Sequence, residues 1–140
     1  MTGLASFRAE LRAWIRSHCP ASLVGRKSTP FDGCWGGRRH FDPDPDTRRW
    51  LDVMASRGFT APEWPRAFGG GGLSAEEAAA LREELAALRL PAPLVGFGLT
   101  MIGPMLLLYG TEAQKQAHVP PIVRGGIRWC LGVSAPGAGA

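Results

Sequence analysis

Several features that would assign the sequence to a class at once are scarce. Its 140 residues contain only 3 cysteines, Cys19, Cys34 and Cys130, which are odd in number and widely spaced. This pattern does not predict a disulfide framework, and it favours a reducing, cytoplasmic location. Charged residues recur through positions 1–19, so the continuous apolar stretch of a secretory signal is missing as well.

Long apolar runs are also missing. The best candidate, residues 94–110, carries no charge but is interrupted by Gly96, Gly98, Gly103 and Pro104. A membrane-spanning helix needs about 20 predominantly apolar residues, so we expect no membrane segment. We interpret this stretch instead as a buried core helix, central in the fold and kinked or divided at Pro104.

Positive charge is in modest excess. Lys and Arg number 16 against 12 Asp and Glu, and the net charge of +4 falls entirely within residues 1–66. An arginine-rich half could bind nucleic acid, but the basic residues do not interleave regularly with the aromatic ones, as they would in a stacking platform. We therefore expect a solvated surface and no nucleic-acid partner.

The composition is that of a globular chain, with 45% hydrophobic and 20% charged residues. Apolar residues recur at helical spacing in stretches that begin with capping residues and end at glycine or proline. Residues 20–46 lack this periodicity and are predicted to form loops. The predicted helices cover residues 4–18, from Asp46 to before Gly58, from the capping box Ser74–Glu77 to before Pro91, and from Thr111 to about His118. Pro120 and Pro121 should break the last of these, with room for one further turn up to Arg124.

Only residues 127–134 have the short aromatic and aliphatic pattern of a β-strand. A lone strand leaves its backbone donors and acceptors unpaired, so its neighbours must come from another chain or from a larger protein of which this chain is a part. We therefore predict a mainly α-helical fold of about five to six helices, followed by one C-terminal strand that lacks its sheet.

Four consecutive glycines, Gly69–Gly72, precede the helix that starts at Ser74 and suggest phosphate binding, because helix N-termini bind anions. The Gly-Lys-Ser/Thr of a phosphate loop does not follow, and no strand clearly precedes them, so we favour a flexible connection. Residues 132–136 approach the Gly-x-Ser-x-Gly nucleophile elbow. Pro136 replaces its second glycine, however, so we do not expect Ser134 to be a hydrolase nucleophile.

No catalytic or metal-binding set stands out. A zinc set could be written from His18, Cys19, Cys34 and His40, but their spacing is longer than the paired spacing of zinc sites. His18 also falls on the apolar stripe of the first predicted helix, which favours a core or capping position. No acidic residue follows Glu112, so any general base near the predicted strand must come from elsewhere. We predict no catalytic residue and no metal ligand in this chain.

Four further segments carry a joint pattern. The first is residues 58–74, G-F-T-A-P-E-W-P-R-A-F-G-G-G-G-L-S, and the second is E-E-L at residues 83–85. The third runs from Gly103-Pro104 through Y-G-T-E-A-Q-K to V-P-P-I-V-R-G at residues 119–125. The fourth is W-C-L-G-V-S-A-P-G-A-G at residues 129–139. In this order, over about 80 residues, they resemble the N-terminal part of the FAD-dependent acyl-CoA dehydrogenases. The helix predicted at residues 4–18 also fits the first helix of that family.

The resemblance implies an N-terminal helical domain at residues 1–125, then the opening strand and flavin loop of a truncated β-domain at residues 126–140. It implies α,β-desaturation of acyl-CoA thioesters, with hydride transferred to FAD. The carboxylate that removes the α-proton would lie in a C-terminal helical bundle outside this chain.

The same resemblance implies four cofactor-binding residues. Leu131, Val133 and Ser134 would approach the pyrimidine end of the flavin. Gly139 would lie near the pyrophosphate, where the missing side chain permits close backbone approach.

Two positions depart from the family pattern: Ala135 replaces a glutamate and Ala140 replaces a serine. Loss of that charge and that phosphate contact predicts weak or absent FAD binding by the chain alone. We expect an N-terminal fragment of an acyl-CoA dehydrogenase, not catalytic by itself, within a homo- or hetero-oligomer. The alternative is a non-catalytic subunit or interaction module that docks on a complete dehydrogenase through the apolar face of residues 94–109 and the unpaired strand.

Overall fold

The computed structural model describes residues 3–26, 34–38, 44–134 and 136–137. Within them the chain is helical, and no β-strand is formed. Short 3₁₀ turns occupy Ala21–Leu23 and Arg66–Phe68, and a π-helical turn occupies Gly98–Ile102. The five α-helices of the described residues are α1 (Gly3–His18), α2 (Pro45–Ser56), α3 (Ala75–Ala87), α4 (Gly103–Tyr109) and α5 (Glu112–Arg124).

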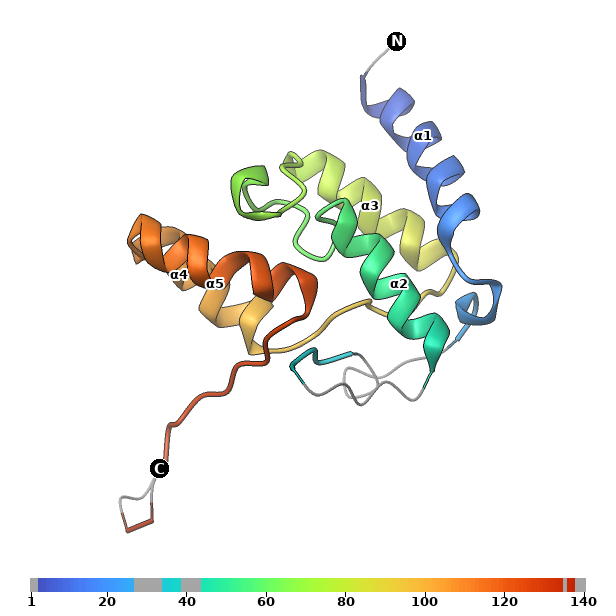
Figure 1. The fold of residues 1–140 in the computed structure, drawn as a ribbon. Helices are drawn as coiled ribbons and strands as arrows, with labels where there is room; N and C mark the ends of the chain where they lie inside the picture. The colour runs from blue at the N-terminus through green and yellow to red at the C-terminus, as the bar shows by residue number, and fades with distance from the viewer. Residues whose placement is uncertain (1–2, 27–33, 39–43, 135, 138–140) are drawn as a thin grey trace.

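The helices form a bundle from which the C-terminal segment extends away (Figure 1). Helix α1 packs on α3, α2 packs on α5, and α5 packs on α4. The largest apolar cluster joins α1, α2 and α3 through Leu11, Ile15, Leu23, Trp50, Met54, Phe59 and Leu81. A second cluster joins the stretch before α3 to α4 and α5 through Ala61, Phe68, Leu106, Val119 and Val123.

Local capping explains where the helices begin. In α3, Glu77 N–H donates to the Ser74 hydroxyl (3.1 Å) and Ser74 N–H donates to the Glu77 carboxylate (3.0 Å), so the predicted capping box is confirmed. The same reciprocal pair forms between Thr111 and Gln114 at the start of α5. Each box satisfies backbone donors that the first helical turn leaves unpaired.

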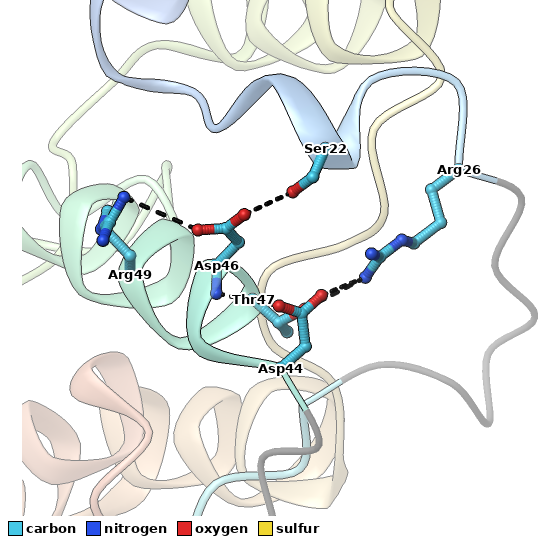
Figure 2. Close-up of polar contacts among 6 residues, drawn as sticks. All are labelled: Ser22, Arg26, Asp44, Asp46, Thr47 and Arg49. Carbon is cyan, nitrogen blue, oxygen red and sulfur yellow. Dashed lines mark hydrogen bonds and ion pairs between the residues drawn. The ribbon is translucent and has the colours of Figure 1, made fainter.

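Helix α2 begins one residue before the predicted Asp46, with Pro45 in its first turn and Asp44 as its N-cap. Asp44 accepts from the Asp46 N–H (3.0 Å) and from the Arg26 guanidinium (2.6 Å) (Figure 2). Ser22 in turn donates to the Asp46 carboxylate (2.6 Å). These contacts fix the start of α2 against the 3₁₀ turn that follows α1.

Surface ion pairs reinforce the contact between α1 and α3. Arg8 bonds to Glu83 and Glu84, and Arg12 bonds to Glu84 at 2.8 Å. The Arg12 hydrogen bond is the main cause that lowers the pKa of Glu84, with the charge of Arg12 and contacts from Arg8 adding to it.

Helix α5 does not break at Pro120 and Pro121, so that prediction was wrong. Each proline lacks the N–H that would pair with the carbonyl four residues earlier, at Gln116 and Ala117. Both of those residues are exposed, so water can satisfy the carbonyls. Burial of Val119, Ile122 and Val123 stabilises the helix through its final turn.

The helix expected at the centre of the fold lies at its edge instead. The π-helical turn and α4 bury Gly98, Gly103 and Leu106, but Leu108 and Tyr109 are 75% and 83% exposed. No helix of the described residues is long and apolar enough to cross a membrane. Sequence composition alone identified an apolar helix without showing that one of its sides has no neighbour among the described residues.

The glycine-rich stretch before α3 is a closely packed loop rather than a flexible connection. The N–H groups of Gly70, Gly71, Gly72 and Leu73 donate to the carbonyls of Pro65, Ala61, Trp64 and Pro62, at 2.9–3.1 Å. A Cβ atom on Gly71 would lie 2.7 Å from the Pro62 carbonyl oxygen. The glycines therefore serve close approach of two backbone segments.

Candidate functional site

The predicted cofactor-binding residues lie in the segment that extends beyond α5. Leu131, Val133 and Ser134 are exposed, Val133 to 80%, and Gly139 lies outside the described residues. Among the described residues, none at 127–134 takes part in a backbone hydrogen bond or a strand. The strand predicted there is absent because nothing in the described chain pairs with it.

The base of this segment is held against the helical body. The Arg128 guanidinium lies 4.8 Å from the centre of the Trp35 ring. The Trp129 ring meets the His118 ring edge-on, with centroids 5.6 Å apart. From Cys130 to Ser134 the residues are exposed. The segment therefore contacts the helical body as far as Trp129 and is exposed from Cys130 to Ser134.

Beside this segment, the π-helical turn and α4 present an exposed apolar surface, here called the outer face of α4. Its side chains are between 39% and 83% exposed, which is unusual for so many large apolar residues in one stretch. It consists of Phe97, Met101, Met105, Leu108 and Tyr109. A surface of this kind marks contact with a protein or an apolar ligand.

The glycine loop does not offer an anion site. Its N–H groups from Gly69 to Leu73 all donate to backbone carbonyls, so none is free to bind phosphate. This supports the interpretation that Gly69–Gly72 is not a phosphate loop, although its structure is not the flexible one expected.

Most acidic side chains of the described residues take part in helix caps or ion pairs, and Glu10 and Glu76 take part in neither. Hydrogen bonds from Arg12 and Arg26 lower the pKa of Glu84 and of Asp44, which favours the charged carboxylates. No group of three or more metal-ligating side chains gathers among the described residues. A core or capping position was predicted for His18, and the core position is wrong, because His18 is exposed and stacks on Trp14 with centroids 5.0 Å apart. Its Nδ1 lies 2.9 Å from the Trp14 carbonyl oxygen in the last turn of α1. His40 of the proposed zinc set lies outside the described residues.

Residues 7–126 match the N-terminal domain of acyl-CoA dehydrogenase. The chain belongs to the acyl-CoA dehydrogenase family. All 140 residues align at 32% identity with acyl-CoA dehydrogenase IpdE1 of Mycobacterium tuberculosis, and the aligned part is 35% of that protein. The chain therefore spans about a third of the length of the curated relative it matches.

Solved acyl-CoA dehydrogenases share the fold. The structure named Tcur3481-Tcur3483 steroid ACAD superposes on 97% of this chain with a TM-score of 0.61 and 32% identity, using 32% of its own chain. The ChsE4-ChsE5 complex from Mycobacterium tuberculosis covers 99% of this chain with a TM-score of 0.62 and 25% identity, over 32% of its own chain. The mainly helical fold expected from the family resemblance is thus confirmed.

The outer face of α4 lies within the apolar stretch at residues 94–109, which the alternative of an interaction module expected to dock on another subunit. Sequence reasoning missed one feature of this acyl-CoA dehydrogenase domain. The contact of Trp35 with Arg128 joins residues far apart in the sequence, and no local sequence pattern predicts it.

Proposed function

We propose that this chain supplies the N-terminal helical domain of an FAD-dependent acyl-CoA dehydrogenase that introduces a double bond between the α and β carbons of an acyl-CoA thioester. The observation that carries this proposal is the domain match over residues 7–126, with 32% identity to IpdE1 along the whole chain. The FAD, when bound, accepts the hydride from the β carbon.

Three exposed residues would hold the pyrimidine end of that cofactor. The described backbone at Leu131, Val133 and Ser134 makes no hydrogen bond within the chain, so its donors and acceptors are available to a ligand. The Ser134 hydroxyl can donate to a carbonyl oxygen of the ring, and the side chains of Leu131 and Val133 offer apolar contact. Gly139 would approach the pyrophosphate, as the family resemblance implies.

The chain would not perform the reaction alone. Removal of the α-proton needs a carboxylate within hydrogen-bond reach, and no acidic side chain follows Glu112. The exposed segment that would bind the flavin holds none between Cys130 and Ser134. We therefore assign the base to the remaining two thirds of the enzyme. This chain would contribute to flavin binding and to the shape of the site.

The outer face of α4 would be covered in the complete enzyme. Met101 and Met105 are 46% and 48% exposed and Leu108 is 75% exposed, so much of their apolar surface is available to a further domain or to the acyl group. The neighbour named a steroid ACAD makes a bulky, ring-containing acyl group the substrate that we would test first.

A second candidate rests on the same surface. The chain would be a non-catalytic subunit that docks its outer face of α4 on a complete dehydrogenase, in a hetero-oligomer. The neighbours named as paired proteins, ChsE4-ChsE5 and Tcur3481-Tcur3483, favour assembly of two different chains.

A chimera tests the first proposal. Residues 1–134 of this chain would replace the corresponding segment of IpdE1, and the purified chimera would be titrated with FAD and then with acyl-CoA under anaerobic conditions. We expect bound, yellow flavin that is bleached by substrate, and weaker FAD binding in the Ser134→Ala chimera. Ser17→Ala, which removes an exposed hydroxyl bonded to the Ala13 carbonyl, serves as the matched control.

A chimera that folds, as judged by circular dichroism, yet binds no FAD would contradict the first proposal. Co-purification of the unaltered chain with a complete dehydrogenase would then support the second candidate. Co-purification that survives Leu108→Glu would count against docking through the outer face of α4.

A further inference from the structure

The exposed C-terminal segment begins at a junction that three separate parts of the chain build. Helix α5 is followed by its C-cap Gly125, whose carbonyl accepts the Gly37 N–H at 2.9 Å. A Cβ atom on Gly36 would lie 2.6 Å from the same carbonyl oxygen, so only glycine allows this approach. The short stretch 34–37 is thereby fixed against the end of α5, directly before the exposed segment starts.

Two residues at the start of the segment, Arg128 and Trp129, contact different parts of the helical body. Arg128 places its guanidinium over the ring of Trp35, which belongs to that same short stretch. Trp129 contacts His118 of α5. Gly98 makes room for the indole, because a Cβ atom there would lie 3.2 Å from Trp129 Cδ1.

The Trp129 ring keeps this position although its polar atom is unpaired within the described chain. Its Nε1 is buried and has no hydrogen-bond partner among the described residues. A buried unpaired donor is costly, so the packing of the ring on His118 and Gly98 must outweigh that cost. Nothing comparable holds the exposed residues that follow.

We propose that Arg128 and Trp129 act as positioning residues: against Trp35 and His118 they form a clamp that sets the direction in which residues 130–134 leave the helical body. The purpose of the clamp rests on the proposed function, because a fixed exit would place Ser134 and its neighbours toward the flavin. The existence of the clamp does not depend on flavin and is tested without it.

Cys130 offers a direct probe of this direction, because it is an exposed thiol one residue beyond the clamp. A spin label on Cys130 and a second one on Ala86→Cys, an exposed position of α3, would report the distance between the segment and the body. Cys19 would be replaced by serine, Cys34 is buried, and a Cys130→Ser sample would reveal any label elsewhere.

We expect one narrow distance distribution for the starting chain. Arg128→Gln and Trp35→Ala should each broaden it by about two-fold or more, because the segment then samples several exits. Trp35→Phe should keep it narrow, since a ring remains beneath the guanidinium. Arg124→Gln, which removes an exposed arginine from the last turn of α5, should leave it unchanged.

Two results would overturn the clamp: a broad distribution in the starting chain, or a distribution in Arg128→Gln as narrow as before. Arg128 is exposed, so its replacement should not unfold the chain, and an unchanged melting temperature would confirm that the broadening is local. A chimera that failed to bind FAD would refute the proposed function and leave this measurement intact.

Discussion

Gly70 lies against the main chain of Trp64 so closely that a Cβ atom at position 70 would come within 2.3 Å of the Trp64 carbonyl oxygen. That oxygen already accepts the Gly72 N–H at 2.9 Å. The contact is between two stretches of backbone, neither of which can rotate away as a flexible side chain could. It fixes the shape of the loop that carries Phe68 and Ala61 into the second apolar cluster.

Gly70→Ala should therefore destabilise the chain by about 1–3 kcal/mol, the usual cost of forcing extra atoms into a packed site. Urea denaturation followed by circular dichroism would measure it. Gly3→Ala is the control, because a Cβ atom there meets nothing within 4 Å. Equal urea midpoints of unfolding for Gly70→Ala and Gly3→Ala would show that the loop can relax around the added methyl group.

The Arg26–Asp44 pair predicts a dependence of stability on pH. Hydrogen bonds from Arg26 and from the Asp46 N–H lower the pKa of Asp44 in the folded chain. The stabilisation is therefore complete above the unfolded pKa of about 3.9, and it is lost as the pH falls through the folded value.

Asp44→Asn should melt earlier than the parent near neutral pH, and the gap should close as the pH falls below about 4. Arg26→Gln removes the same ion pair from its other side and should show the same trend. A gap of constant size from neutral to acidic pH would mean that the charge of Asp44 does not stabilise the start of α2.

Arg89 has a left-handed backbone, with φ of 50°, directly after the C-cap of α3. Glycine adopts this conformation without the clash that costs other residues about 1–2 kcal/mol. Arg89→Gly should thus stabilise the chain by up to about 1 kcal/mol, after the entropy of a freer unfolded chain is subtracted. Arg82→Gly, within α3, should instead destabilise it, and a lower unfolding midpoint for Arg89→Gly would refute the argument.

The outer face of α4 predicts self-association of the isolated chain. Leu108→Glu should reduce association with little effect on the melting temperature, because this side chain is 75% exposed. Leu106 lies two residues before Leu108 in α4 but is only 8% exposed, so Leu106→Glu should unfold or strongly destabilise the chain. Size-exclusion chromatography with light scattering across a concentration series would measure the first effect, and a chain that stays monomeric without the substitution would contradict it.

The isolated chain should be colourless and should not reduce flavin with any acyl-CoA. Ser134 has no sheet to hold it, Ala140 has no hydroxyl where the family resemblance places a phosphate contact, and no carboxylate follows Glu112. Flavin fluorescence during FAD titration tests binding, and anaerobic bleaching tests turnover. Saturable binding with turnover would show that a base lies among the acidic residues up to Glu112.

The sequence predicted those parts of the fold that depend on neighbouring residues. The capping boxes at Ser74 and Thr111 act within one helical turn, so their partners are visible from spacing alone. The family motifs predicted the helical domain for the same reason, since each motif is contiguous.

Features that depend on distant segments were predicted poorly. Helix α5 continues through Pro120 and Pro121 because buried side chains on its inner side compensate for the lost hydrogen bonds. The packing of Gly70 on Trp64 was likewise invisible, because four glycines in a row look the same whether a loop is loose or tightly bonded. The cofactor-binding residues Leu131, Val133, Ser134 and Gly139 stay a prediction.

Pro120 and Pro121 also affect the free energy of covering α5 with a partner protein. With no N–H at positions 120 and 121, the carbonyls of Gln116 and Ala117 lose their usual helical donor and are open to hydrogen bonds from water. Any partner that covered this side of α5 would have to supply donors or retain those waters, since stripping them costs free energy. Leu108 on α4 carries no such cost, because apolar side chains gain from losing their water. Hydration thus steers association toward α4 and away from the exposed side of α5.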